Sequence, residues 1–390
     1  MTVRPVGRRA AALVAVASLG LAACSSSSKT SSGNSGSSTG GSAGTLKLGF
    51  FGALTGANAQ LGINIENGEK LAVAQYNATN PKNKVTIDAF DSQGDPSQAN
   101  NGATKLINDK VVAVLGPAFS GESAAADPIF ESAQIPNVSA SATNVKLAQN
   151  GWKYFHRVLA DDSLQGPADA DYLVKTLKHT NVAVIDDNST YGLGLADAVR
   201  GQITKDGGKD VLDDHVDPNG ADYGSTVNKI VASNAQAVFY GGYYDAAGRL
   251  IKQLRAAGYK GDFMSGDGSE DDRFISDAGG APAEGAYLSC ACADVTNEAS
   301  AASFVSAYKQ MFNAPPAIYS AEGYDATNFM LAAIKAGNTT PVAVNKYLAD
   351  NTWQGVTKDI KFLPNGNIAG GTIYVYKVEN GKIVQIGTTS

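Results

Sequence analysis

Short apolar runs alternate with longer amphipathic stretches over most of the chain. The clearest run is 111–115, VVAVL, which contains no polar position. A run of this kind predicts a strand that is buried on both faces, as in a parallel sheet. Gly116 and Pro117 end the run, and the Ala-rich segment that opens at Ser120 predicts a helix. A strand, a tight turn and a helix N-terminus can together bind an anion, because the first N–H groups of a helix have no partner inside it.

The same alternation precedes and follows this segment. Parallel strands joined by helices need right-handed crossovers, so the pattern predicts an α/β protein with doubly wound parallel sheets. A second short strand over 135–143 ends in another small, hydroxyl-rich turn, and the tail, 371–378 and 382–387, predicts a β-hairpin. The other expected strands are 46–51, 85–90, 182–186, 237–240, 262–265 and 286–290, and the expected helices are 63–77, 96–108, 165–177, 191–205, 245–257, 300–311 and 325–336.

The alternation pauses at 152–161 and then restarts, which predicts two lobes of similar architecture. We expect residues 45–160 with 291–363 in the first lobe, and 161–290 with 364–390 in the second. Ligands of open parallel sheets bind beyond the carboxyl ends of the strands. A binding site is therefore expected in the cleft between the lobes.

The first 44 residues differ in composition from the rest. Three arginines precede the apolar stretch 10–21, which is too short to span a bilayer comfortably and favours a signal peptide over residues 1–23. The stretch ends in Leu-Ala-Ala-Cys, which resembles a bacterial lipobox and implies cleavage before Cys24 and lipidation of its sulfur; an ordinary cleavage site is the alternative. Residues 24–44 are nearly all Ser and Gly and predict a flexible tether. The folded part would thus be exported and held by lipid at the outer face of the cytoplasmic membrane.

Composition and motifs limit the classes of function. The net charge is −6, and no basic stripe interleaved with aromatic residues occurs, which argues against nucleic acid as a partner. No nucleophile elbow, dinucleotide fingerprint or P-loop is present, so we expect neither an enzyme nor a cofactor, although a glycosidase carboxylate pair stays open. Cys290 and Cys292 form a disulfide or remain free thiols, and a metal site is not expected because none of the three histidines is near them in sequence.

Several short stretches carry a family resemblance through their order and spacing. They are 53–56, 91–96, 116–120, 157–161, 165–167, 191–195, 239–243, 263–268 and 324–326. In these stretches the chain resembles the branched-chain amino acid (Leu/Ile/Val)-binding family of periplasmic binding proteins, the extracytoplasmic receptors of ABC importers. The resemblance covers about 45–380 and implies two hinged lobes, joined by three crossover strands, that close over a ligand.

The resemblance implies a site with two ends. The first lobe would hold the carboxylate of an amino acid, and the second would supply an acidic residue for its ammonium and two tyrosines that close over it. The residues implied are Ser120, Ser141, Ala142 and Thr143 in the first lobe, and Tyr191, Tyr243 and Asp267 in the second.

The residues also have simpler interpretations. Ser120 and Thr143 could be helix N-caps, and the tyrosines could be ordinary cleft or core aromatics. Asp267 is followed by three further acids at 270–272. Such a cluster is typical of a solvated acidic loop, and a calcium loop is a second alternative.

Four positions depart from the family pattern. Leu61 stands where the family has tyrosine, Phe119 replaces a cysteine, and Tyr319 replaces a phenylalanine. The acid is Asp267 instead of glutamate. The polar and acidic residues that would bind the two charged ends of a zwitterion are therefore retained. Leu61, Phe119 and Tyr319 form an altered side-chain subsite.

We accordingly expect a monomeric protein that captures a free branched-chain or other apolar amino acid and delivers it to ABC permease subunits in the membrane. The alternatives are a receptor of the same fold for a small amide, urea or an aromatic acid, and a ligand sensor for a signalling partner. Asp267 favours an amino acid, because a neutral amide would leave a buried carboxylate unpaired.

Overall fold

The computed structural model describes residues 44–292 and 294–389, and every structural statement below concerns these residues. The predicted signal peptide, Cys24 and all of the predicted tether except Gly44 lie outside them. Within the described ranges, no helix is both long and apolar enough to cross a membrane.

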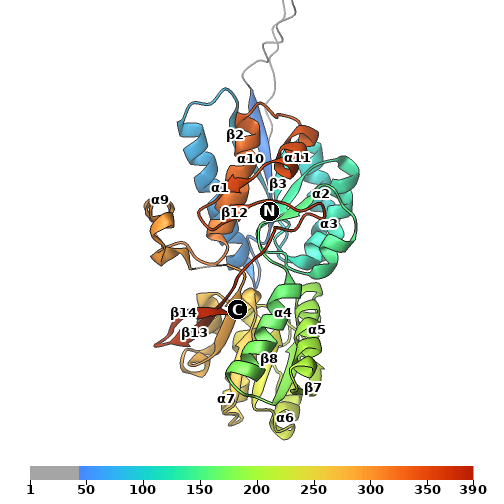
Figure 1. Cartoon of the computed structure of the whole chain (residues 1–390), viewed down its shortest axis with the longest axis vertical. Helices are drawn as coiled ribbons and strands as arrows, with labels where there is room; N and C mark the ends of the chain where they lie inside the picture. The colour runs from blue at the N-terminus through green and yellow to red at the C-terminus, as the bar shows by residue number, and fades with distance from the viewer. Residues whose placement is uncertain (1–43, 293, 390) are drawn as a thin grey trace, which may run out of the picture. The chain divides into compact units, whose positions relative to one another are not determined.

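The first lobe is built on a five-stranded parallel sheet in the order β2-β1-β3-β4-β5. In Figure 1, α1 and α10 run side by side in this lobe. The strands are β1 (Thr45–Gly52), β2 (Lys84–Asp91), β3 (Ala113–Leu115), β4 (Asn137–Ser139) and β5 (Phe155–Arg157), and the helices are α1 (Ala59–Ala78), α2 (Ala99–Asn108), α3 (Ser120–Ala133), α9 (Ala302–Phe312), α10 (Ser320–Lys335) and α11 (Pro341–Asp350). A small two-stranded sheet, β11 (Trp353–Gln354) and β12 (Asp359–Ile360), follows α11.

The second lobe is built on a seven-stranded sheet in the order β14-β13-β10-β9-β8-β6-β7. The strands β6 to β10 are parallel, and the predicted C-terminal hairpin adds β13 antiparallel to β10. The strands are β6 (Asn181–Asp186), β7 (Lys209–His215), β8 (Ala237–Gly241), β9 (Asp262–Ser265), β10 (Tyr287–Cys290), β13 (Ile373–Glu379) and β14 (Lys382–Thr389), and the helices are α4 (Asp162–Asp171), α5 (Thr190–Lys205), α6 (Gly224–Ala232), α7 (Tyr244–Ala256) and α8 (Asp272–Ala278).

Both sheets are covered on two faces, as the uninterrupted apolar runs predicted. On β1, Phe50 packs into one hydrophobic cluster and its neighbour Phe51 into another. On β6, Val182 and Ala183 are divided between two clusters in the same way. Successive side chains of a strand point to opposite faces, so each sheet has a core on both sides and the doubly wound architecture is confirmed.

The third passage between the lobes lies later in the chain than we predicted from the sequence. The expected boundary was at 363/364. Phe362 instead pairs with Ile368 in an antiparallel bridge, and the Gly366 carbonyl accepts a hydrogen bond from the Arg157 N–H of β5. The chain therefore stays with the first sheet as far as Ile368 and joins the second sheet at Ile373.

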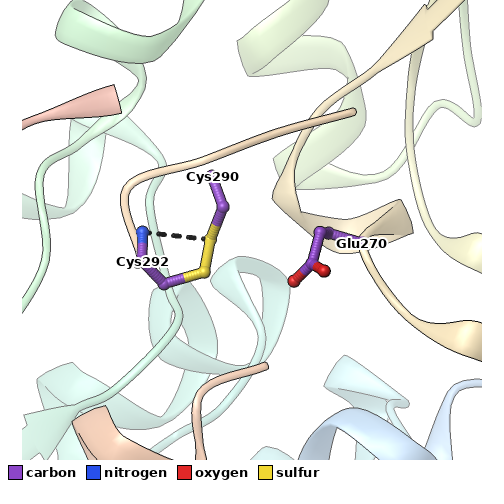
Figure 2. Close-up of side chains that lie close together, drawn as sticks. All are labelled: Glu270, Cys290 and Cys292. Carbon is purple, nitrogen blue, oxygen red and sulfur yellow. Dashed lines mark hydrogen bonds between the residues drawn. A yellow bond between two sulfur atoms is a disulfide. The ribbon is translucent and has the colours of Figure 1, made fainter. Parts of the chain in front are cut away.

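Cys290 and Cys292 are joined by a disulfide at the end of β10, with their Cα atoms 5.0 Å apart. Figure 2 shows the Glu270 carboxylate close to this disulfide. The three residues could present ligand atoms within 4.8 Å of one another. Because the two sulfur atoms are bonded to each other, they offer no thiolate to a metal ion.

Candidate functional site

A small cavity lies between the lobes, where the predicted ligand residues of both lobes meet. Its volume is about 10 Å³, roughly the space of one water molecule. The walls combine hydroxyl groups, one carboxylate and apolar or aromatic faces. The lining residues are Leu61, Ala118, Phe119, Ser120, Ser141, Tyr191, Tyr243, Asp267, Gly268 and Tyr319.

The first lobe contributes a cluster of small hydroxyl side chains at the N-terminus of α3. Ser120 is the first residue of α3, and its Oγ accepts a hydrogen bond of 3.2 Å from the Asn144 N–H. Ser141 Oγ donates to the Ala118 carbonyl at 2.5 Å. The N-cap of α3 is Phe119, so Ser120 does not cap this helix. Ser120 and Ser141 line the cavity at the N-terminus of α3, and the N-terminus of a helix favours an anion.

Ala142 and Thr143 lie behind this wall and do not line the cavity. The Ala142 N–H donates to Ser139 Oγ at 3.0 Å, and the Ala142 carbonyl accepts from Arg157 Nη1 at 3.1 Å. Thr143 is fully buried, and its hydroxyl has no hydrogen-bond partner in the described part of the chain. It caps no helix, because Asn144 fills that position for the following 3₁₀ turn.

Arg157 is a positioning residue that the sequence did not single out. Its guanidinium is completely buried, forms a salt bridge of 2.7 Å with Asp161, and donates to the carbonyls of Ala142 and Asn144. It thereby fixes the turn that follows β4. The signal available from sequence was an arginine four residues before the first of two consecutive aspartates, Asp161 and Asp162, which is a weak pattern without the fold.

The second lobe contributes Asp267, which begins a 3₁₀ turn after β9. Its Oδ1 accepts a hydrogen bond of 2.6 Å from the Tyr191 hydroxyl, and its Oδ2 accepts one of 2.5 Å from the Tyr319 hydroxyl. The side chain is 1% exposed. Burial raises the pKa of Asp267, and the two tyrosine hydroxyls oppose that rise by stabilising the carboxylate.

The four acids around residue 270 do not converge on one point, which argues against the calcium loop. Asp267 points into the cavity, while Asp271 caps α8 by accepting from the Arg273 N–H at 2.9 Å. Glu270 faces the disulfide (Figure 2), and Asp272 is exposed. The solvated acidic loop is also wrong for Asp267, because this side chain is buried.

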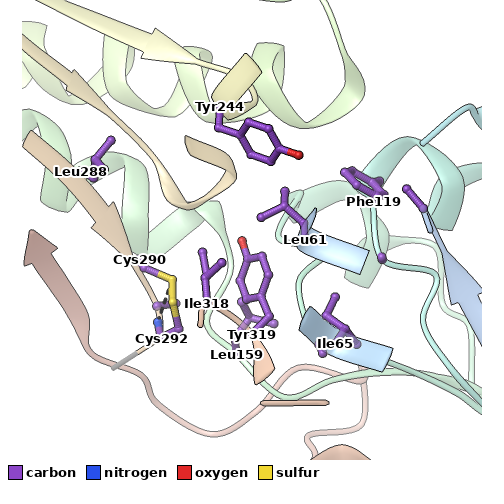
Figure 3. Packing of buried hydrophobic residues seen from close by; sticks show 14 of the residues in the cluster. Leu61, Ile65, Phe119, Leu159, Tyr244, Leu288, Cys290, Cys292, Ile318 and Tyr319 are labelled. Atoms are coloured by element: carbon purple, nitrogen blue, oxygen red, sulfur yellow. Dashed lines mark hydrogen bonds between the residues drawn. A yellow bond between two sulfur atoms is a disulfide. The ribbon is translucent and has the colours of Figure 1, made fainter. Parts of the chain in front are cut away.

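Aromatic rings and one leucine complete the walls. The Phe119 and Tyr243 rings meet edge to face with their centroids 5.1 Å apart, and Tyr191 stacks at a tilt on Tyr243 at the same distance. Figure 3 shows Leu61 of α1 between Tyr319 and Phe119. The predicted side-chain subsite of Leu61, Phe119 and Tyr319 is thus assembled, but Tyr319 also bonds to the acid.

Two further acids, Asp162 and Asp169 of α4, lie buried beside the Asp267 carboxylate. Neither has a hydrogen-bond partner for its carboxyl oxygens by geometry among the described residues. Burial raises the pKa of each far above the usual range, and the negative charge of Asp267 adds to the rise. Asp162 and Asp169 are therefore harder to ionise than Asp267, whose carboxylate accepts two tyrosine hydroxyls. The sequence analysis did not identify either residue.

The lobes touch directly across the cleft. Besides the bond between Tyr319 and Asp267, Asn144 Nδ2 donates to the Thr190 carbonyl at 2.6 Å. Farther out, beyond Phe119 and Tyr243, the cleft widens into a cavity of about 530 Å³. The inner cavity of about 10 Å³ is smaller than an amino acid, so binding one there requires the lobes or the lining side chains to move.

Comparisons with known proteins found similar proteins whose names describe amino-acid binding. An "amino acid binding protein" of Pseudomonas aeruginosa is 36% identical over 236 residues, which are 60% of this chain and 63% of that protein. A "Leu/Ile/Val-binding protein homolog 3" of Brucella melitensis is 29% identical over 344 residues, 87% of this chain and 93% of that one.

A solved structure agrees as well. The branched-chain amino acid transporter substrate-binding protein LivJ of Streptococcus pneumoniae, in complex with isoleucine, superposes with a TM-score of 0.81 at 28% identity and covers 88% of this chain and 100% of its own. Residues 45–382 match the sequence model of the family described as periplasmic binding protein. The two-lobed fold and this match together establish that the chain belongs to the periplasmic binding protein family.

Proposed function

We propose that this protein is the extracytoplasmic substrate-binding protein of an ABC importer and that it captures a free amino acid with an apolar side chain, branched-chain amino acids above all. The observation that carries the proposal is the pairing across the cavity of a hydroxyl cluster at a helix N-terminus with the buried carboxylate of Asp267. The isoleucine bound by LivJ and the names of the relatives support it.

The proposed binding mode follows from charge. The ligand carboxylate would bind at Ser120, Ser141 and the first turn of α3, where hydroxyls and a helix N-terminus favour an anion. The ammonium would bind Asp267, and closure of the lobes would remove water from both ends together. Ala142 and Thr143 do not line the cavity, so their contact with the ligand stays a prediction.

The ligand would then leave unaltered for the permease. In this proposal Cys24 anchors the protein to the membrane through its lipid, and the Ser/Gly-rich tether lets the lobes reach permease subunits. Only the closed form would bind the permease well, so the ligand selects the form that is competent for transport. Mass spectrometry of the recovered ligand tests this point, because a chemically changed ligand would indicate an enzyme.

One observation favours a second candidate, an aromatic or other organic acid without an ammonium group. Both oxygens of Asp267 already accept tyrosine hydroxyls, so the carboxylate has partners even when no ammonium is bound. From the sequence we argued that a ligand without an ammonium would leave Asp267 buried and unpaired. The two tyrosine hydroxyls weaken that argument. Measuring leucine against the matched 2-keto acid, 4-methyl-2-oxopentanoate, separates the two candidates.

The central test is the variant Asp267→Ala. We expect it to lower the affinity for leucine by at least about tenfold, because an ammonium would be buried without a counter-charge. Isothermal titration calorimetry on the purified protein measures this, with Asp272→Ala as the matched control, since Asp272 is an exposed acid of α8. Leucine binding of ordinary strength in Asp267→Ala would refute the amino-acid assignment.

A further inference from the structure

The helix α1 has no side-chain cap of its own at its N-terminus. A helix leaves its first backbone N–H groups without partners inside it, and the side chain of the N-cap residue commonly accepts one of them. The N-cap of α1 is Asn58, but its side chain caps nothing, and its buried Oδ1 has no hydrogen-bond partner among the residues that the structure describes. The first turn of α1 therefore needs acceptors from elsewhere.

One of these acceptors belongs to the other lobe. The N–H groups of Ala59 and Leu61 donate to carbonyls of the preceding turn, at 3.4 and 3.3 Å. The N–H of Gln60, between them, donates instead to the hydroxyl of Tyr244, at 3.3 Å. Tyr244 is the first residue of α7 in the second lobe. Its hydroxyl thus caps α1 from across the cleft.

A second contact between the lobes lies one turn farther along α1. Asn64 Nδ2 donates to Oδ2 of Asp271 at 3.4 Å, and Asn64 Oδ1 accepts from Gln60 Nε2 at 2.8 Å. Asp271 is the N-cap of α8 in the second lobe. The side chains of Asn64, Asp271 and Tyr244 are all buried. These polar contacts are therefore shielded from water, which strengthens them.

The contact between Gln60 and Tyr244 connects two walls of the candidate site without lining it. Neither residue lines the inner cavity, whereas their neighbours in the chain, Leu61 and Tyr243, both do. Figure 3 shows the Tyr244 ring reaching from the second lobe toward Leu61. The hydrogen bond from Gln60 to Tyr244 therefore helps to set the positions of Leu61 and Tyr243 relative to each other.

We propose that Tyr244 is a positioning residue that stabilises the closed, ligand-bound form by capping α1 across the cleft. The inference rests on the proposed function in one respect, that binding of a ligand closes the lobes. When the lobes are apart, the Gln60 N–H is left to water, and closure exchanges that water for the Tyr244 hydroxyl. The bond forms after the ligand has docked and contributes equally to the binding of every ligand over which the lobes close.

The test is Tyr244→Phe, which removes only the hydroxyl. We expect the dissociation constants for leucine and for valine to rise by the same factor, about three- to tenfold, which corresponds to the loss of one hydrogen bond. Because the bond forms on closure, the rise should come from faster dissociation, with an unchanged association rate. Calorimetry measures the constants, and stopped-flow fluorescence measures the rates.

The matched control is Tyr324→Phe in α10, whose hydroxyl donates to Gln75 of α1 at 2.6 Å within the first lobe. This variant should leave the constants and rates unchanged. In the ligand-saturated protein, the Gln60 amide should exchange its hydrogen faster in Tyr244→Phe than in the parent and in Tyr324→Phe. Asn64→Ala removes the second contact and should also raise both dissociation constants by one factor, which provides an independent variant if Tyr244→Phe folds poorly.

The outcomes separate this inference from the proposed function. If the parent binds leucine and Tyr244→Phe binds it equally well, the cap is wrong and the proposed function stands. Unequal factors for leucine and valine would mean that Tyr244 acts on the ligand side chain, which would also overturn the inference. If the parent binds 4-methyl-2-oxopentanoate and no amino acid, the proposed function is wrong. Faster dissociation of the keto acid from Tyr244→Phe would then still support the cap.

Discussion

At the scale of single residues, buried acids without full hydrogen bonding shape the site. Glu122, the third residue of α3, accepts a hydrogen bond of 3.3 Å from the Phe119 N–H through one carboxyl oxygen. The other oxygen has no partner in the described part of the chain. Burial raises the pKa of Glu122 to about 8, against the smaller opposing effect of the nearby Ser92 side chain and the Phe119 N–H. The N-terminus of α3 therefore carries a neutral glutamic acid at neutral pH.

Glu122 predicts a pH dependence of stability. Between its ordinary pKa of 4.5 and its raised pKa of about 8, the folded protein keeps a proton that the unfolded chain has released. The free energy of unfolding therefore falls as the pH rises through this window. Urea denaturation at pH 5 and pH 8 measures the decrease in the free energy of unfolding between these two pH values. In Glu122→Gln this decrease should be smaller than in the parent protein by about 2 kcal/mol or more. Glu131→Gln, on the same helix but less buried, is the control; an unchanged fall in Glu122→Gln would contradict the prediction.

At the scale of elements, the long apolar runs were predictable and the short polar ones were not. The strand β5 has three residues, two of them His156 and Arg157, and it was read as a pause in the pattern. The strand β7, KDVLDDH, lies at one edge of its sheet, has only two apolar residues, which are adjacent, and was missed. Helices of seven to ten residues, α6, α8 and α11, were missed too. Such segments depend on tertiary packing, because their own hydrophobic signal is weak.

The packing of α1 on α10 predicts the effect of one substitution. A Cβ on Gly68 of α1 would lie 2.2 Å from the Ser320 carbonyl oxygen and 2.7 Å from the Tyr324 nitrogen. Gly68→Ala should therefore force the helices apart and lower the free energy of unfolding by about 2 kcal/mol. Gly201→Ala in α5, where the new Cβ meets nothing within 4 Å, should instead stabilise by roughly 0.5–1 kcal/mol. Denaturant titration compares the two, and equal effects would refute the close-packing argument.

At the scale of the whole molecule, the site exists only where the two lobes meet. Ser120 and Leu61 come from the first lobe and Asp267 and Tyr191 from the second, so each lobe alone holds half of the polar groups. The connections near 158–161, 290–292 and 369–372 are the places where a hinge movement can change the distance between these halves. Binding is thereby coupled to the arrangement of the lobes.

Ligand binding should stabilise the folded protein against unfolding. A ligand that binds only the folded protein should raise the free energy of unfolding by about 2.7 kcal/mol at about 100 times its dissociation constant. In a thermal-shift screen of the standard amino acids, leucine, isoleucine or valine should raise the melting temperature of the parent protein, and Asp267→Ala should require at least about tenfold more ligand for the same shift. A screen in which no amino acid shifts the melting temperature would argue for the organic-acid alternative.

The sequence by itself determined the class of fold, because buried parallel strands must be continuously apolar and the turns between them need small residues. Through the resemblance to the branched-chain amino acid-binding family it also indicated Ser120, Ser141, Tyr191, Tyr243 and Asp267, which line the cavity. Only the tertiary structure decided that Arg157 holds the carbonyl of Ala142, that Asp162 and Asp169 lie buried beside Asp267, and that Tyr319 reaches this carboxylate from the other lobe. Such contacts join residues that are far apart in the sequence. They depend on side-chain directions and on the positions of the lobes, which local sequence patterns do not predict.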